Sequence, residues 1–249
     1  MCRAQTSAFM AAAVTQQFLL LLFIQTIRLS KVRRWILSRE MSPRPYNLGK
    51  RRDLIGQGRR QILDATRALL GEFSSYTAFT VEAVARRADV ARATVYYQFG
   101  SKSGLLEALC DDLAEAGQMS DLAEAFTSPD PAEALRRFVA GFGRFWDVDR
   151  LAMRRLRALA ALDPDVGSVI AARDQRRCEG LQVLASRFAA DPHARVPVDS
   201  GKVVRMLHAL TSFETFDALA VPGQPLTGVV PDILSLAEAV LRPSGEPGR

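Results

Sequence analysis

Apolar residues recur at helical spacing along most of the chain after position 57, and this pattern restricts the fold more than any other feature. In residues 57–70, for example, Ile62, Ala65 and Leu69 lie three or four positions apart, opposite a basic side. No stretch alternates β-branched and aromatic residues as a half-buried strand would, while Ala, Leu, Arg and Glu dominate. We therefore expect an all-α protein.

The helix boundaries are clearest at the first two short helices. Thr80 is a favourable N-cap for a helix over residues 81–88, and Glu82 is an acid in its first turn. Asp89 follows, where the chain must turn, and Asp tolerates such a conformation better than most residues. A second short helix is expected over residues 92–98.

Further breaks divide the rest of the chain. Gly100 ends the helix over 92–98, and Ser101 can cap a longer helix after it. Beyond Gly117 the sequence predicts only helices and breaks. The expected helices cover residues 131–146, 150–162, 166–190, 198–221 and 229–241.

Charge is distributed unevenly along the chain. The net charge of +6 comprises +5 from residues 1–40, +6 from residues 41–102 and −5 from residues 103–249. A basic head that binds a polyanion, attached to a mildly acidic body, would have this distribution. We expect five segments: an apolar extension (1–40), a basic flexible arm (41–56), a basic head (57–104), a helical body (105–241) and a flexible tail (242–249).

The apolar extension is open to three interpretations. Residues 8–27 contain no charged residue and are long enough to cross a bilayer, with a basic flank that would lie in the cytoplasm. Alternatively, translation begins at Met41, which opens a polar, basic segment, and the extension is never made. It could also form an extra helix or a disordered tail.

The two short helices suggest a helix-turn-helix for DNA. A helix over residues 92–98 is about 10 Å long and fits a major groove about 12 Å wide. Arg92 and Thr94, near its start, can reach base edges. Adjacent helical residues point about 100° apart, so one of Tyr96 and Tyr97 can pack between helices while the other faces a phosphate.

The following helix supplies a further phosphate contact. Lys102 lies at its start, where its ammonium and the free backbone N–H groups can converge on one phosphate. A DNA-binding role for these residues rests on their combination, because a lone tyrosine is more often a core residue and a lone arginine is usually a solvated charge.

The segment "FTVEAVARRADVARATVYYQFGSKSGLLEAL" resembles the DNA-binding motif of the TetR family of transcriptional regulators, with a continuous match over residues 57–113. The resemblance implies a homodimer, a helical effector-binding body and repression relieved by a small molecule. Asp89 replaces the family's usual glycine, Gln98 replaces a frequent histidine, and Glu82 is an acid near the expected DNA face. The residues that the resemblance assigns to DNA are Thr80, Arg92, Ala93, Thr94, Tyr96, Tyr97, Gln98 and Lys102.

In this family the last two long helices pair across a dimer interface. The residues that would suit such an interface, or alternatively the core, are Leu207, Leu210, Ile233, Leu236, Ala237 and Val240. A cavity between body helices, rich in aromatic residues, would accept a largely apolar effector. The candidates, each of which could instead be ordinary core, are Phe142, Phe145, Trp146, Met153, Phe213 and Phe216.

Other classes of protein lack support in the sequence. Its two histidines, His193 and His208, lie in different contexts, and no glycine-rich nucleotide fingerprint appears, so we expect neither an enzyme nor a cofactor. The three widely spaced cysteines suggest neither a disulfide framework nor a zinc site, and a reducing cytoplasm is the simplest compartment. Two alternatives keep the same head: a membrane-tethered regulator and an effector-independent one.

Overall fold

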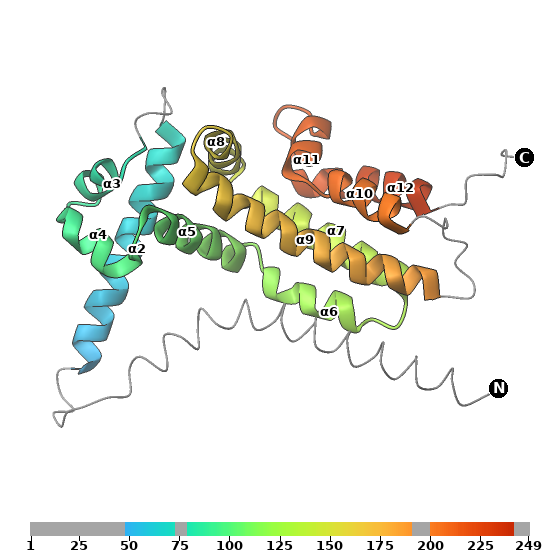
Figure 1. Ribbon diagram of the computed structural model, residues 1–249, viewed down its shortest axis with the longest axis horizontal. Coiled ribbons are helices and arrows are strands. Elements are labelled where there is room, and N and C mark those ends of the chain that lie inside the picture. The colour runs from blue at the N-terminus through green and yellow to red at the C-terminus, as the bar shows by residue number, and fades with distance from the viewer. Residues whose placement is uncertain (1–47, 73–78, 191–199, 242–249) are drawn as a thin grey trace, which may run out of the picture.

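The chain is helical in every regular element that the computed structural model describes, over residues 48–72, 79–190 and 200–241. This confirms the expected all-α class. The helices form a small head at one end and an elongated body (Figure 1).

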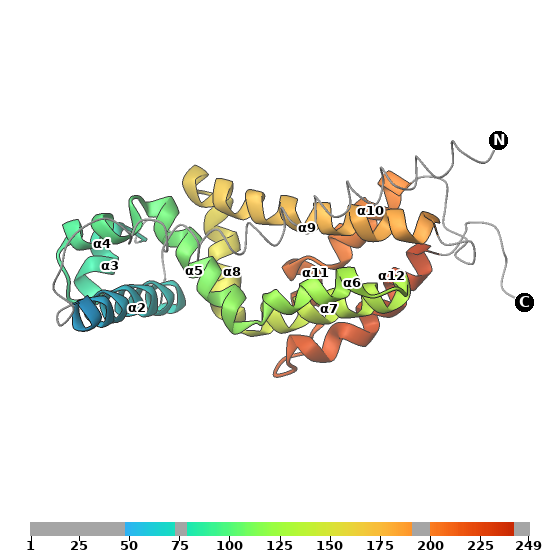
Figure 2. The same ribbon diagram turned by 90° about the horizontal axis from the view of Figure 1, so that it is seen from below.

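The head gathers three helices at one end of the molecule (Figures 1 and 2). They are α2 (Leu48–Glu72), α3 (Val81–Arg87) and α4 (Arg92–Phe99). Their apolar sides meet in a core where Ile62, Val84 and Val95 are almost fully buried. This core fixes how α3 and α4 lie on α2.

Helix α5 (Lys102–Ala116) connects the head to the body and packs against both. The body continues through η2 (Met119–Asp121), α6 (Leu122–Thr127), α7 (Pro131–Asp147), α8 (Arg150–Ala160), α9 (Pro164–Ala190), α10 (Ser200–Leu210), α11 (Phe213–Leu219), η3 (Leu226–Val229) and α12 (Val230–Leu241). Helices α7 and α9 both run along the body and contact each other, and α10, α11 and α12 lie in the half of the body away from the head (Figures 1 and 2).

Two expected caps are present. The Thr80 hydroxyl accepts a hydrogen bond from Ala83 N at 3.1 Å, and the Ser101 hydroxyl accepts one from Gly104 N at 3.0 Å. Each satisfies a backbone donor that the first turn of a helix leaves free. These caps set where α3 and α5 begin.

Three boundaries differ from the sequence-based expectation. Helix α2 begins at Leu48, so residues 48–56 are helical rather than part of a flexible arm; Lys, Arg and Leu here favour a helix. The helix expected over 198–221 is two helices. They separate at Ser212, whose hydroxyl accepts a hydrogen bond from Thr215 N at 3.3 Å and so caps α11. Helix α6 was not expected.

The two glycines inside α7 permit close packing of neighbouring helices. A Cβ on Gly141 would lie 2.7 Å from a methyl carbon of Leu122, and one on Gly143 would lie 2.7 Å from a methyl carbon of Val230. The space beside each glycine is therefore occupied by a side chain of a neighbouring helix, and no ligand fits there.

Among the residues that the structure describes, no helix has both the length and the apolar character needed to span a bilayer. The apolar run 8–27, Met41 and the tail 242–249 lie outside those residues.

We predict that Phe138 is a main contributor to the stability of the body. Its ring is fully buried and contacts the rings of Phe126 and Phe142, with centroids 6.0 and 4.9 Å away. Phe138→Ala should lower the free energy of unfolding by about 3–5 kcal/mol, measured by urea denaturation. Leu162→Ala, at a residue 63% exposed, is the control and should change it by about 0.5 kcal/mol or less. Equal losses in the two variants would contradict this assignment.

Candidate nucleic-acid interface

Helices α3 and α4 are joined by a tight turn centred on Asp89. Asp89 adopts φ 49°, in the left-handed region, and Val90 N donates to Ala85 O at 3.0 Å. The turn therefore forms with Asp where the family usually has glycine, as expected for a residue that tolerates this conformation. Gly100 ends α4 and also has a positive φ, 77°, which glycine adopts readily.

One side of α4 is held in the core and the other faces solvent. Val95 is 1% exposed and anchors the helix, whereas Tyr96 is 38% and Tyr97 is 87% exposed. The expectation that one tyrosine packs between helices is therefore wrong, because Val95 takes that place. Arg92 and Ala93 are exposed, and Thr94 and Gln98 are half-buried. The expected DNA-binding residues of α4 thus remain open to a ligand.

Arg92 is held by two neighbours. Its Nε lies 2.7 Å from Glu82 Oε1, and its Nη2 donates to the Tyr96 hydroxyl at 3.3 Å. The guanidinium also lies over the Tyr96 ring, 5.2 Å from the centroid. The Tyr96 hydroxyl, followed by the charge of Glu82, raises the pKa of Arg92 above its ordinary value. Glu82, the acid near the expected DNA face, is thus a partner of the expected base-reading residue.

Lys102 lies at the junction of head and body. Its Nζ donates to Asp163 Oδ2 at 2.5 Å and lies 5.4 Å from the centre of the Phe79 ring. Asp163 immediately precedes α9. In this conformation the ammonium is engaged by the body, so binding of a phosphate by Lys102 would require it to leave Asp163.

A second ion pair joins the same two parts. Arg67, on α2, donates through Nε to Asp149 Oδ2 at 2.5 Å and through Nη2 to Val148 O at 3.1 Å. Asp149 is the N-cap of α8 and also accepts from Ala152 N at 2.9 Å. Two cations of the head thus contact carboxylates that begin two body helices.

These two ion pairs were not among the sequence-based expectations. Asp163 Oδ1 accepts hydrogen bonds from the backbone N of Asp165 and Val166 at 3.0 and 3.3 Å and so caps α9. The other oxygen, Oδ2, forms the ion pair with Lys102. An Asp before each of α8 and α9 is the available signal for capping. The cation that each one meets lies 82 or 61 residues away in sequence, so no local pattern reveals it.

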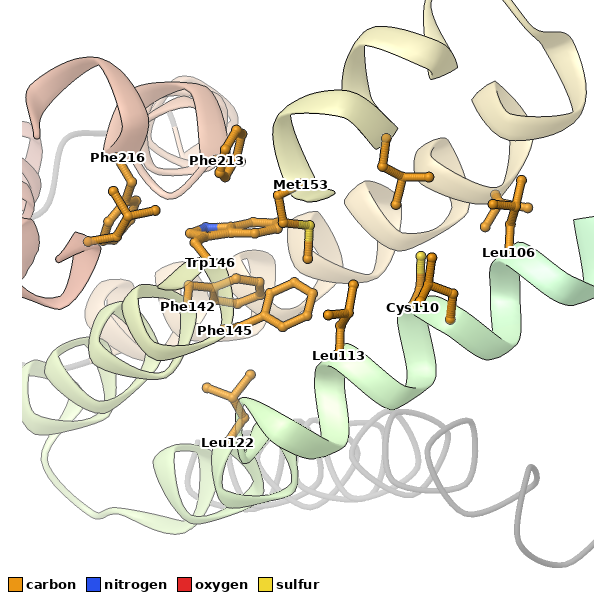
Figure 3. Close-up of a cluster of buried hydrophobic side chains, with 14 of the residues drawn as sticks. Leu106, Cys110, Leu113, Leu122, Phe142, Phe145, Trp146, Met153, Phe213 and Phe216 are labelled. Carbon is orange, nitrogen blue, oxygen red and sulfur yellow. The ribbon is translucent and has the colours of Figure 1, made fainter. Parts of the chain in front are cut away.

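The aromatic residues proposed for a pocket gather in one buried cluster in the body (Figure 3). Trp146 is central: its ring centroid lies 5.7 Å from that of Phe142, 4.6 Å from Phe145 and 5.8 Å from Phe213. Met153 and Phe216 are also buried. A surface cleft of about 410 Å³ lies beside this cluster, lined by Arg154, Arg157, Ala158, Phe213, Glu214, Asp217 and Ala218. Of the six candidates, Phe213 lines this cleft.

The candidate dimer residues fall into two groups. Leu207, Ile233 and Ala237 are fully buried within a single chain, so the structure places them in the core and not on a surface for a partner. They face inward because α10 and α12 pack against each other. Leu210 and Val240 are half-buried, and Leu236 is 44% exposed. These three remain available to a second chain.

The histidines and possible metal ligands add no further site. His208 contacts Arg177, and His193 lies outside the described residues. Within the described ranges, no group of three or more His, Cys, Asp or Glu side chains could hold a metal ion.

The sequence of the head matches the family model for "Bacterial regulatory proteins, tetR family" over residues 62–109. The chain is also 37% identical over 87 residues to the HTH-type transcriptional regulator BetI of Serratia proteamaculans. That match covers 33% of this chain and 42% of the length of BetI. The family-model match thus covers part of α2, all of α3 and α4, and the first half of α5.

Solved structures resemble a larger part of the chain. The TetR-family regulator PfmR of Thermus thermophilus matches with a TM-score of 0.55 and 24% identity, over 74% of this chain and 99% of PfmR. The regulator FadR of Bacillus subtilis, solved in complex with stearoyl-CoA, matches with a TM-score of 0.56 and 16% identity, over 73% of this chain and 98% of FadR. At these identities the similarity establishes the fold.

We predict that the ion pair between Lys102 and Asp163 makes stability depend on pH. The hydrogen bond from Lys102 holds the pKa of Asp163 below its ordinary value. The carboxylate therefore stabilises the fold fully above that ordinary value, about 3.9, and less as the pH falls through the lowered pKa. Asp163→Asn keeps an oxygen for the cap but removes the charge. The variant should be less stable by about 1 kcal/mol at neutral pH, and the difference should vanish in acid.

Urea denaturation across this pH range measures the effect. Asp165→Asn, at an exposed carboxylate in the same turn, is the control. A difference between wild type and Asp163→Asn that stays constant with pH would show that the charge of Asp163 is not its source.

Proposed function

Because the chain belongs to the TetR family of bacterial regulatory proteins, we propose that it regulates transcription by binding double-stranded operator DNA through α3 and α4. One observation carries this proposal: α4 is anchored in the core by Val95 while its opposite side presents Arg92, Tyr96 and Tyr97 to solvent. The eight residues of α4 form a rod about 12 Å long, which a major groove accommodates.

The exposed side chains suit separate roles in DNA recognition. Arg92 can donate two hydrogen bonds to a guanine, and the methyl group of Thr94 can contact a thymine methyl. The hydroxyls of Tyr97 and Thr80 and the amide of Gln98 can contact phosphates, which position the helix without reading sequence. Glu82 would orient Arg92 before DNA arrives.

The two head-to-body ion pairs support a route for regulation. In the proposed repressor, a small, largely apolar effector binds the body and displaces its helices. Because Asp149 and Asp163 begin α8 and α9, a shift of either helix moves the carboxylate that holds Arg67 or Lys102. The recognition helices would then lose the spacing required by successive major grooves, about 34 Å.

The outer side of α10 and α12 supports the proposed homodimer. Met206 and Leu236, which are 43% and 44% exposed, add apolar surface to that of Leu210 and Val240. A two-fold axis between two such faces would hold two heads in one assembly, which a pair of operator half-sites requires.

An effector-independent regulator with the same head is the second candidate. It is favoured by the direct contacts of Phe142 with Phe145 and Trp146 and of Phe145 with Trp146. The two candidates differ in whether any small molecule changes DNA binding.

We predict that Arg92→Ala removes sequence discrimination. A duplex selected from a random library by the wild-type protein should bind the variant more weakly by about 1–3 kcal/mol, while binding to unrelated duplex changes far less. Fluorescence anisotropy titrations at one fixed salt concentration measure both.

Arg136→Ala is the matched control for this titration. Arg136 is also an exposed arginine paired with a glutamate, Glu133, at 2.9 Å, but it lies in the body. Its removal should leave both affinities unchanged. The proposed role of α4 would be wrong if Arg92→Ala and Arg136→Ala had the same effect, or if wild type selected no duplex.

We predict that Leu236→Glu weakens self-association. A carboxylate buried between two chains without a partner is unfavourable, so the dissociation constant of the dimer should rise by about tenfold or more. Sedimentation velocity measures it. Leu219→Glu, at a residue 42% exposed on α11, is the control and should leave the dimer intact. Dimers of undiminished stability in Leu236→Glu would exclude this face.

A further inference from the structure

Arg177, on α9, is a cation buried in the body with most of its donors unused. The residue is 3% exposed. Its Nη2 donates to Asp174 Oδ1 at 3.2 Å and to His208 Nε2 at 3.0 Å. Its Nε and Nη1 are buried and have no hydrogen-bond partner. A guanidinium carries one N–H on Nε and two on Nη1, so three buried donors remain unsatisfied.

His208 cannot balance the charge of Arg177. An arginine only donates, so Nε2 of His208 must accept and the ring proton must lie on Nδ1. The ring is therefore neutral when it meets Arg177, and Asp174 O, 3.1 Å from the same nitrogen, receives no proton from it. Burial, followed by the charge of Arg177, lowers the pKa of His208, in agreement with a neutral ring.

The two cations Arg157 and Arg177 are balanced only if an exposed carboxylate, Glu214, is counted with Asp174. Asp174 is shared, because Arg157 Nη2 also donates to its Oδ2 at 3.0 Å. Glu214 pairs with Arg157, but from an exposed position. Burial lowers the pKa of Arg177 to about 10, so the group is still a cation at neutral pH. A buried cation without full pairing is costly, and an incoming anion would relieve that cost.

The walls around Arg177 are aromatic. Its Cζ lies 5.8 Å from the ring centre of Phe142 and 5.9 Å from that of Trp146. Arg157, the other cation on Asp174, lines the 410 Å³ cleft, and so does Phe213, whose ring contacts Trp146 (Figure 3). Two side chains thus link the cleft to the surroundings of Arg177: Arg157 through the shared Asp174, and Phe213 through Trp146.

We propose that the body binds an aromatic carboxylate, with its carboxylate on Nη1 of Arg177 and its ring against Trp146 and Phe142. A carboxylate oxygen accepts a short, charge-assisted hydrogen bond from a guanidinium N–H, and its negative charge would pair with the buried cation. Flat apolar walls suit a flat ring. This inference rests on the proposed function, because it names the chemical class of the effector; it replaces a purely apolar effector by an amphipathic one.

The first test needs no ligand. Arg177→Met removes the buried charge but leaves Asp174 paired with Arg157. A residue kept for binding is not needed for stability, so the melting temperature of the full-length variant should equal or exceed that of wild type. Arg176→Met, at the adjacent arginine of α9, is the control. A fall of several degrees in Arg177→Met alone would show a structural role and overturn the proposal.

The second test compares 2-naphthoate with its neutral isostere 2-naphthamide, by thermal shift and calorimetry on the full chain. Naphthoate should bind wild type about tenfold more tightly or better, because the amide lacks the charge. Arg177→Met should abolish this preference, Arg177→Lys should reduce it, and Arg176→Met should retain it. Equal binding of the two compounds, a preference that survives Arg177→Met, or no binding of either compound would overturn the proposal.

Binding of a selected duplex, measured on the same samples, separates this inference from the proposed function. Selective DNA binding with no preference for naphthoate would support the proposed regulatory function and exclude the proposed carboxylate site. A preference for naphthoate that depends on Arg177, without selective DNA binding, would support the carboxylate site and exclude the proposed regulatory function.

Discussion

Burial of the apolar side of α5 is the constraint on which the rest of the structure depends. Leu105, Leu106, Leu109 and Leu113 are fully buried, and the helix packs against α2 and α4 in the head and against α7 and α9 in the body. Each such leucine stabilises the fold by about 1.5–3 kcal/mol relative to an exposed one. Because this one helix is packed into both parts, a displacement of α5 by the body would also act on the head.

Two ion pairs, Arg67–Asp149 and Lys102–Asp163, add specific contacts between the head and the body. Lys102 and Arg67 are partly exposed, and each contact contributes little to stability by itself. Their importance is geometric, since each carboxylate also caps a body helix. DNA phosphate and Asp163 would compete for the same ammonium, so DNA binding and the resting arrangement of the body oppose each other. An anion that settles on Arg177 would act on α9, the helix that Asp163 begins.

Local chemistry accounts for what the sequence could predict. Thr80, Asp89, Gly100 and Ser101 act through their own backbone surroundings, so the helix-turn-helix was predictable to within a residue or two. Long-range packing decides the rest. Val95 is buried in the core of the head where a tyrosine was expected. Leu207 and Ile233 are buried in the body, and Lys102 bonds to Asp163, which lies 61 residues away in sequence. The unused donors of Arg177 could not be anticipated, because they depend on which carboxylates reach it in the folded body.

Methylation interference on a duplex selected by the protein tests the central claim, that α4 lies in a major groove, most directly. Guanine N7 faces the major groove, so its methylation should block binding at two clusters about one helical turn, 10–10.5 base pairs, or a multiple of it, apart. The Arg92→Ala protein should lose sensitivity at one guanine in each cluster. Binding that is indifferent to N7 methylation, or selection that yields no preferred duplex, would contradict the account.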